Sequence, residues 1–313
     1  MNIIKKSIYS LVLKSPSFIK VLYFKKIKGY KIGKNTLLGK RAWINGASVE
    51  IGDNVSIGNF STLNSNKIKI GNNTKIDNNS RVVASKSIQV GKGCYIGSLV
   101  TIGGGQSRHS ELEMGNRVKI FENSYINTTR KVYLGDDVGI GGHTLIFTHG
   151  TWQNTYKGYP YKFGDVTIKK GAWLPWRVFV MPGVTIGENA TIGSAATIVK
   201  DISNGYFAAG SPAKELKPDT EYVKPENNIK VLKEILHEQS LDYNFQHGTS
   251  YQVDLEKLEI RNNDKVLVKY YTSYENLNAD LCLIDTEKTI QSSNSIINLN
   301  NNLASIKQRN TFT

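Results

Sequence analysis

Residues 184–195 read Val184-Thr-Ile-Gly-Glu-Asn-Ala-Thr-Ile-Gly-Ser-Ala195, and they contain the same six-residue unit twice. In each unit an isoleucine is followed by a glycine and then by polar or small residues. The spacing continues on both sides, with aliphatic residues at Ile168, Leu174, Val180, Ile186, Ile192 and Ile198. A helix with one apolar face repeats every three to four residues, and a half-buried strand repeats every two. A period of six fits neither.

The same period occurs earlier in the chain, in sets of three that are separated by insertions of one or two residues. These sets are Ile32, Leu38 and Ile44; Ile51, Ile57 and Leu63; Ile70, Ile76 and Val82; and Val90, Ile96 and Ile102. A coil of three short flat faces, each with one inward aliphatic residue, explains the period. Glycine near a corner allows a positive φ or a close approach of two backbones. The pattern therefore predicts a mainly β stack of coils, in which each coil buries its neighbour's inner side chains; the alternative is an ordinary soluble sheet.

Composition and charge narrow the class of protein. The 313 residues are 39% hydrophobic and 21% charged, which is typical of a globular chain and too apolar for a disordered one. The net charge is +14, but residues 1–41 hold eleven Lys and Arg and no Asp or Glu, so nearly the whole excess lies at one end. A nucleic-acid-binding domain more often spreads its basic residues over a groove or a recognition helix, so we expect no nucleic-acid partner.

The basic N-terminal segment, residues 1–29, contains apolar residues at helical spacing. Ile3, Ile4, Ile8, Leu11 and Val12 fall on one side of a helix, and Phe18, Val21, Leu22 and Phe24 follow Pro16. Residues 1–28 are therefore predicted either to dock on an anionic membrane surface or to cap the open apolar end of the first coil. The chain has no run of eighteen uncharged apolar residues and no signal-peptide pattern. With two cysteines, Cys94 and Cys282, this favours a cytoplasmic protein, peripheral at the inner face of the membrane.

Two segments interrupt the repeat, at residues 103–117 and 147–165. The second contains Thr148-His149-Gly150-Thr151-Trp152, and loops that leave a rigid scaffold often carry function. After the repeat ends near Lys200, residues 225–241 predict a helix, and residues 265–271 and 281–284 predict strands. The expected organisation is thus a basic helical segment over 1–29, a β-helix over 30–218 and a small α+β extension over 219–313, with a Ser- and Asn-rich loop over 291–302.

The repeat, the Thr148-His149 loop and residues 173–217 together resemble the bacterial hexapeptide-repeat acyltransferases, of the sugar and polysaccharide O-acetyltransferase type. The most specific segments are Pro182-Gly-Val-Thr-Ile-Gly187, Ile192-Gly-Ser-Ala195, Val199-Lys-Asp-Ile202 and Ala208-Ala-Gly-Ser-Pro-Ala-Lys214. The resemblance implies a left-handed parallel β-helix, and a homotrimer with three active sites between subunits.

By this resemblance His149 is the catalytic base. A sugar hydroxyl is a poor nucleophile at neutral pH, and an imidazole that takes its proton contributes roughly 10²–10⁴-fold. The family pattern assigns the oxyanion donor to the backbone N–H of Trp176, although Pro175 stands here where the family has glycine. His143 lies on a regular face of the repeat and is expected to point outward.

The resemblance also implies acetyl-CoA as co-substrate. Trp173, Ser194 and Ala195 are expected along its pantetheine arm, and Lys200, Lys214 and Lys217 at its phosphates, although surface lysines are common in this chain. Asn127, Trp152 and Tyr156 are candidates for binding a carbohydrate acceptor, and Trp152 and Tyr156 could equally pack the loop. His109, His143 and His149 lack Cys or carboxylate partners at metal spacing, so no metal is expected.

The sequence therefore predicts an acetyl-CoA-dependent O-acetyltransferase that acts on a sugar hydroxyl of a bacterial surface polysaccharide, of capsule or O-antigen type, or on its precursor. Transfer is expected to be direct, without an acyl-enzyme. One alternative is N-acetylation of a nucleotide-linked amino sugar, for which His149 would matter less. The other is a non-catalytic β-helical scaffold, against which His149 and the three lysines argue.

Overall fold

The computed structural model describes residues 11–150, 154–159 and 161–218, and in the C-terminal part residues 237, 241, 244, 252–254, 259–262, 265–270 and 283–284. The chain divides into two compact units, residues 1–220 and 221–313, which are described separately. Several predictions fall outside the described residues: those for Trp152 and Cys282, for Ile3, Ile4 and Ile8, for most of the helix over 225–241 and for the loop over 291–302.

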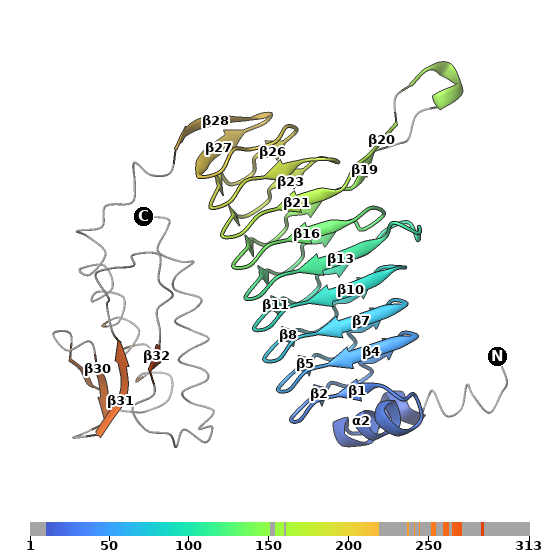
Figure 1. Cartoon of the computed structure of the whole chain (residues 1–313), viewed down its shortest axis with the longest axis vertical. Helices are drawn as coiled ribbons and strands as arrows, with labels where there is room; N and C mark the ends of the chain where they lie inside the picture. Colours follow the sequence, from blue (N-terminus) through green and yellow to red (C-terminus); the bar gives the residue numbers. More distant parts are fainter. Residues whose placement is uncertain are drawn as a thin grey trace. The chain divides into compact units, whose positions relative to one another are not determined.

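The first unit is a parallel β-solenoid of about nine turns with three faces (Figure 1). Face A consists of β1 (Lys31–Ile32), β4 (Ser48–Ile51), β7 (Lys67–Ile70), β10 (Ser87–Val90), β13 (Glu111–Met114), β16 (Val132–Leu134), β21 (Val166–Ile168) and β24 (Thr185–Ile186). Face B consists of β2 (Leu37–Leu38), β5 (Ser56–Ile57), β8 (Lys75–Ile76), β11 (Tyr95–Ile96), β14 (Lys119–Ile120), β17 (Gly139–Ile140), β22 (Trp173–Leu174), β25 (Thr191–Ile192), β27 (Tyr206–Gly210) and β28 (Ala213–Pro218). Face C consists of β3 (Trp43–Asn45), β6 (Thr62–Asn64), β9 (Arg81–Val83), β12 (Thr101–Ile102), β15 (Tyr125–Ile126), β18 (Leu145–Ile146), β23 (Phe179–Val180) and β26 (Thr197–Ile198).

The chain passes from face A to B to C in every coil, so two corners matter for the site. The turns that lead from a face B strand to the next face C strand form the B–C corner, and those from face C to the next face A strand form the C–A corner. Neighbouring strands pair in parallel, except for the last pair, β27 and β28, which is antiparallel. The predicted left-handed parallel β-helix is confirmed in its repeat and its three parallel faces.

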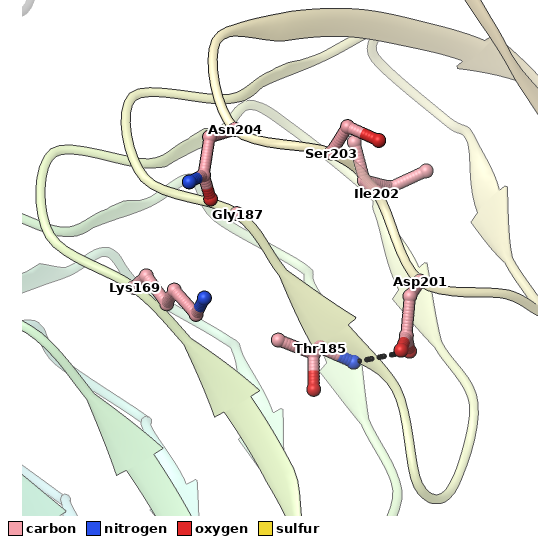
Figure 2. A pocket seen from close by; sticks show the side chains of 7 residues that line it. All are labelled: Lys169, Thr185, Gly187, Asp201, Ile202, Ser203 and Asn204. Carbon is pink, nitrogen blue, oxygen red and sulfur yellow. Dashed lines mark hydrogen bonds between the residues drawn. The ribbon is translucent and has the colours of Figure 1, made fainter.

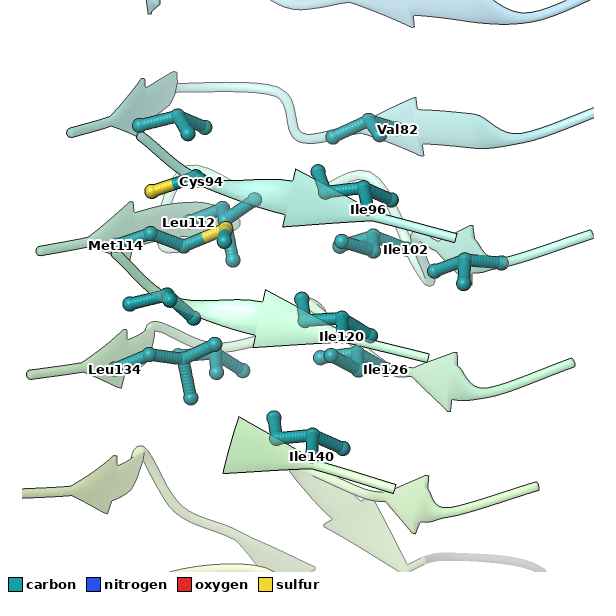
Figure 3. Packing of buried hydrophobic residues seen from close by; sticks show 14 of the residues in the cluster. Val82, Cys94, Ile96, Ile102, Leu112, Met114, Ile120, Ile126, Leu134 and Ile140 are labelled. Atoms are coloured by element: carbon teal, nitrogen blue, oxygen red, sulfur yellow. The ribbon is translucent and has the colours of Figure 1, made fainter. Parts of the chain in front are cut away.

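The aliphatic residues that repeat every six positions form the core. All those named in the sequence analysis are less than 8% exposed, and they stack directly above one another from coil to coil (Figure 3). Ile96 pairs with Ile120, for example, and Ile120 with Ile140. Each inward aliphatic residue packs on an aliphatic residue of the next coil, so the repeat is also the main source of hydrophobic stabilisation.

The repeat glycines are required by close approach rather than by a positive φ. A Cβ at Gly33 would lie 2.5 Å from the carbonyl carbon of Gly52 in the next coil. The left-handed backbone conformation occurs two residues later, most often at asparagine, which tolerates it. Asn35, Asn54 and Asn73 have φ of 54–57°, and the side-chain amide of each of the first two donates to the next, at 3.1 and 3.0 Å.

The first coil is covered by a short helix. Residues 11–14 are helical, and α2 (Ser17–Lys26) follows and lies against β1 and β2. Phe24 is fully buried, with its ring stacked on that of Tyr30 and edge-on to that of Trp43. Lys20 is buried as well, and its ammonium group donates to the carbonyl oxygen of Gly39. Thus one side of α2 closes the apolar end of the solenoid.

Both predicted interruptions leave the solenoid at the C–A corner. The second forms a hairpin of β19 (His149–Gly150) and β20 (Lys162–Phe163), with the 3₁₀ helix η1 (Thr155–Lys157) between them, and it projects from the stack (Figure 1). The prediction that the first interruption runs to residue 117 is wrong. The loop covers only residues 103–110, because Leu112 and Met114 point inward as a regular face A strand.

The second unit contains an antiparallel sheet in its described part. It is formed by β29 (Gln252–Asp254), β30 (Glu259–Asn262), β31 (Lys265–Tyr270) and β32 (Leu283–Ile284). β31 and β32 agree with the strands predicted over 265–271 and 281–284, and residues 237, 241 and 244 are helical. No helix within the described residues combines the length and the apolar character that crossing a bilayer requires.

Candidate active site

His149 begins strand β19, where the chain leaves face C at the C–A corner. Its half-buried ring is stacked on Phe163 of β20, with 5.9 Å between the ring centroids and an angle of 21°. The pairing of β19 with β20 places these two residues opposite each other. Phe147 lies on another side of the ring, at 6.4 Å between centroids. The hairpin thus holds the imidazole between aromatic rings while leaving part of it open.

Asn127 fixes which nitrogen of His149 carries the proton. It follows β15 at the same corner one coil earlier and is only 2% exposed. Its Oδ1 accepts a hydrogen bond from the backbone N–H of Thr129 at 3.0 Å, which identifies this atom as the oxygen, and it lies 3.1 Å from His149 Nδ1. An amide oxygen can only accept, so Nδ1 of the neutral ring carries hydrogen and Nε2 is left as the basic nitrogen.

Thr148 makes the backbone before His149 rigid. Its buried hydroxyl lies 2.9 Å from Asn127 Oδ1 and 3.0 Å from the carbonyl oxygen of Asn127. It also accepts a hydrogen bond from the backbone N–H of Arg130 at 3.0 Å. The guanidinium of Arg130 lies over the ring of Phe163, 5.3 Å from its centroid, in a cation–π contact. Two successive coils are therefore tied together around the imidazole.

Trp176 lies at the B–C corner, between β22 and β23. Its side chain is 47% exposed, lies beside the ring of His143 at 5.7 Å and covers Gly142, where a Cβ would approach the indole to 2.7 Å. The carbonyl oxygen of Trp176 accepts a hydrogen bond from Ala195. Its backbone N–H donates to no acceptor within the described part of the chain.

Within one chain the structure does not bring His149 and Trp176 together. They occupy the two corners at opposite edges of face C, so the width of that face separates them. A base and an oxyanion donor that serve one reacting carbonyl must both lie close to it. These two residues can form one site only if the C–A corner of one chain meets the B–C corner of another.

The predicted cofactor residues lie in three places: at or near the B–C corner, at the C–A corner and on the terminal strand of face B. Ser194 and Ala195 are exposed at the B–C corner in the coil after Trp176, and the half-buried Trp173 lies next to them on β22. Lys200 is exposed at the C–A corner, two coils after His149. Lys214 and Lys217 lie on β28, at the terminal edge of face B. The structure therefore groups Trp173, Ser194 and Ala195 with Trp176 but does not gather the three lysines at one place.

Of the two predicted acceptor residues that the structure describes, Asn127 lies at His149 and Tyr156 does not. Tyr156 is fully exposed in η1 and packs against no part of the loop, and Trp152 falls outside the described residues. Sequence reasoning missed Phe163 and Arg130. Neither stands out in the sequence, because their positions depend on the pairing of β20 with β19.

A pocket near the end of the solenoid contains none of the predicted site residues. Its lining consists of Lys169, Thr185, Gly187, Asp201, Ile202, Ser203 and Asn204 (Figure 2). The carboxylate of Asp201 already accepts a hydrogen bond from the backbone N–H of Thr185 at 2.7 Å. Among the residues with described positions, no three His, Cys, Asp or Glu side chains gather in a way that could hold a metal ion.

Comparison with known proteins agrees with this fold. Residues 30–64 match the family described as "Hexapeptide repeat of succinyl-transferase". The chain is 37% identical over 89 residues to the galactoside O-acetyltransferase of Escherichia coli K12, covering 28% of this chain and 43% of the relative. It is 33% identical over 66 residues to a chloramphenicol acetyltransferase of Agrobacterium fabrum, covering 21% of this chain and 31% of the relative.

The sequence matches thus span less than half the length of these curated relatives. Among solved structures, a UDP-N-acetylglucosamine acyltransferase from Bacteroides fragilis is similar over 71% of this chain and 82% of its own, with 16% identity and a TM-score of 0.45. The six-residue repeat and the three parallel faces are those of a hexapeptide-repeat protein, and over the matched segments the chain is similar to hexapeptide-repeat acetyltransferases.

Proposed function

We propose that this protein is an acetyl-CoA-dependent O-acetyltransferase that acts on a sugar hydroxyl of a bacterial surface polysaccharide or its precursor. The observation that carries the proposal is the hydrogen bond between Asn127 and His149, which leaves Nε2 of an accessible imidazole as a base. One relative is an O-acetyltransferase for a galactoside, which supports a sugar hydroxyl as the acceptor.

The reaction proceeds by direct transfer. Nε2 of His149 takes the proton from the acceptor hydroxyl while its oxygen attacks the thioester carbonyl carbon and forms the new C–O bond. The tetrahedral intermediate then breaks its C–S bond, and the proton passes from Nε2 to the departing sulfur of CoA. Asn127 Oδ1 accepts from Nδ1–H throughout, so it stabilises the imidazolium that exists between the two proton transfers.

A homotrimer completes this site in our proposal. The partner subunit's Trp176 would then bring its backbone N–H to the carbonyl that His149 serves, and the partner subunit's Ser194 and Ala195 would lie along the pantetheine arm. The outer side of face C carries aromatic rings suited to such an interface. The ring of Phe147 is 5.5 Å from that of Tyr125 and 5.4 Å from that of Phe179. In this arrangement Lys200, Lys214 and Lys217 would bind the CoA phosphates.

Mass spectrometry of surface polysaccharide from cells with and without the gene tests the proposal. Wild-type protein is expected to add the mass of one acetyl group per modified sugar, in an ester that mild alkali removes. His149→Ala should not restore it, whereas His237→Ala, an exposed histidine of the second unit, should. An alkali-stable acetyl group restored equally by His149→Ala would refute O-transfer and support N-acetylation of an amino sugar, because an amine needs the base less.

We also propose that the outer side of α2 docks on an anionic membrane at its cytoplasmic face. Phe18, Leu22 and Lys25 follow one another at helical spacing on the side of α2 that faces away from the solenoid, with Lys26 beside them. Phe18 is 71% exposed and Leu22 is 55% exposed. Basic residues near anionic lipid contribute about 1 kcal/mol each.

Co-sedimentation with vesicles tests this docking. Wild-type protein should bind vesicles that contain phosphatidylserine, in a salt-sensitive manner, and should not bind neutral ones. Phe18→Ser with Leu22→Ser should abolish binding, whereas Leu241→Ser, an exposed leucine of the second unit, should not. Equal binding to neutral vesicles, or none to either kind, would contradict the proposal.

A further inference from the structure

Three arginines lie on successive coils on the N-terminal side of His149: Arg81 at the start of a face C strand, and Arg108 and Arg130 at the C–A corner. Arg81 is on β9, Arg108 is in the loop of residues 103–110 that follows β12, and Arg130 follows β15. Strands of neighbouring coils are about 4.8 Å apart, so the three positions span roughly 10 Å along the solenoid. Arg81 and Arg108 are exposed and Arg130 is half-buried. We refer to these three residues as the arginine column.

Side-chain and backbone contacts connect the arginine column to the C–A corner at His149. Arg81 reaches the start of the loop, since a Cβ at Gly103 would lie 3.0 Å from its Nη1. Within the loop, the hydroxyl of Ser107, which precedes Arg108, donates to the carbonyl oxygen of Thr129 at 2.7 Å. Arg130 lies over Phe163, which is itself stacked on His149. The column and the imidazole therefore belong to one continuous surface.

The loop is held close to this surface by a glycine. A Cβ at Gly104 would lie 2.7 Å from both Asn127 Nδ2 and Thr129 Oγ1, so only glycine lets the loop pack here. The backbone N–H of Gly105 donates to Thr129 Oγ1 at 2.9 Å. Arg108 is thus presented from a loop that is fixed against the residues around His149 rather than from a free surface turn.

The charges of the arginine column are not neutralised by the protein. None of the three forms a salt bridge within the described part of the chain. The acidic residues nearby in sequence are already engaged: Glu111 with Lys86 at 2.7 Å, and Glu113 with Lys131. Arg108 donates from Nε to His109 Nε2 at 3.0 Å, which leaves its terminal N–H groups for a ligand.

We propose that the acceptor is an anionic saccharide, whose acidic groups bind the arginine column while one hydroxyl reaches His149. This inference rests on the proposed function, in which the predicted acetyl-CoA residues lie on the coils after that of His149. The acceptor would then approach from the coils before it. A guanidinium matches a carboxylate or a phosphate in a bidentate geometry and stays charged at all relevant pH values. A column of three, one coil apart, suits a polymer with repeated acidic groups better than a single free anion.

Calorimetric titration of the full-length protein without acetyl-CoA tests the inference. Three probes are used at low ionic strength: oligogalacturonate, the same oligosaccharide after methyl esterification, and a phosphorylated mannan fragment. We expect at least one acidic probe to bind and the neutral ester not to bind. The tighter of the two acidic probes identifies the acidic group as carboxylate or phosphate.

Arginine variants decide whether the column is responsible. Each of Arg81→Gln, Arg108→Gln and Arg130→Gln should weaken binding about two- to fivefold, and the triple variant at least about tenfold. Arg41→Gln is the matched control, because Arg41 is also an exposed arginine over an aromatic ring, Phe60, at 5.7 Å, but at the B–C corner of the first coils. Unchanged thermal unfolding of the triple variant confirms that it folds.

The outcomes separate this inference from the proposed function. No binding of either acidic probe, equal binding of the ester, or an equal loss in Arg41→Gln would overturn the arginine column as a binding site. Acetyl transfer to a neutral saccharide only would also overturn it while leaving O-acetylation intact. Binding that depends on the column and persists in His149→Ala would support it even if no acetyl transfer were found.

Discussion

Replacing Asn127 by alanine tests the geometry on which the proposed chemistry depends. The change removes Oδ1, which accepts from Thr129 N–H and lies 3.1 Å from His149 Nδ1. Thr148 keeps an alternative acceptor in the carbonyl oxygen of residue 127. The unpaired buried N–H of Thr129 is therefore the main cost, about 1–3 kcal/mol of the free energy of unfolding. For a unit of this size that lowers the melting temperature by several degrees.

The effect on His149 is separate from this loss of stability. Without the acceptor, the ring is no longer restricted to the tautomer with hydrogen on Nδ1, and the imidazolium loses its hydrogen bond. We expect kcat to fall by roughly tenfold or more, up to the 10²–10⁴-fold that a general base contributes. The KM for acetyl-CoA should hardly change, because Asn127 lies on the coil before His149 and the predicted cofactor residues lie on later coils.

Asn127→Asp provides the matched variant. A carboxylate still accepts from the backbone N–H of Thr129 and from Nδ1–H of His149, so the tautomer is kept and kcat should stay closer to that of the wild type than in Asn127→Ala.

Long-range ¹H–¹⁵N correlation spectra, with the signals of His149 assigned from His149→Ala, report the tautomer directly. Wild type and Asn127→Asp should show hydrogen on Nδ1. If Asn127→Ala kept both this tautomer and wild-type kcat, the role assigned to Asn127 would be refuted.

Three further predictions concern the base, the cofactor and the core. His149→Ala should lower turnover by roughly 10²-fold or more while acetyl-CoA binding, measured by calorimetry, stays unchanged. Replacing Lys200, Lys214 and Lys217 by alanine should raise the KM for acetyl-CoA and flatten its salt dependence, with little change in acceptor KM; equal damage to both would indicate a misfolded last coil. Burial raises the pKa of Cys94 to about 11, so iodoacetamide at pH 8.5 should not label it in the native protein, and rapid labelling would contradict its place in the core.

The fold was predictable because one inward aliphatic residue per face leaves a period that no helix or single strand produces. Ile168, Leu174 and Val180 are fully buried, as their spacing required. The backbone conformation at the corners between faces was less predictable. The left-handed positions are occupied not only by asparagine but also by Phe60, Leu99 and other residues, so no single residue type marks them in the sequence.

The site was only partly predictable, because the lengths of the two insertions decide which side chains come into contact. The resemblance gave His149, but it assigned Asn127 to the acceptor, whereas in the same chain it bonds the ring of His149. That contact follows from position, because Asn127 directly follows β15, and Thr148 and His149 follow soon after β18, the paired face C strand of the next coil. Phe163 and Arg130 meet only because β20 folds back on β19, and no period in the sequence predicts that register.

In the N-terminal segment, the two alternatives that the sequence left open, capping of the first coil and membrane docking, involve different sides of the helix α2. Its apolar residues do not form a single stripe: Phe24 faces the first coil and is fully buried, whereas Phe18 and Leu22 face away from it. The charges divide in the same way, because Lys20 is buried against the carbonyl oxygen of Gly39 while Lys25 is exposed. Capping therefore uses only one side of α2 and accounts for none of the exposed apolar area. Because the outer side combines that area with lysines and no carboxylate, membrane docking requires no rearrangement of the cap.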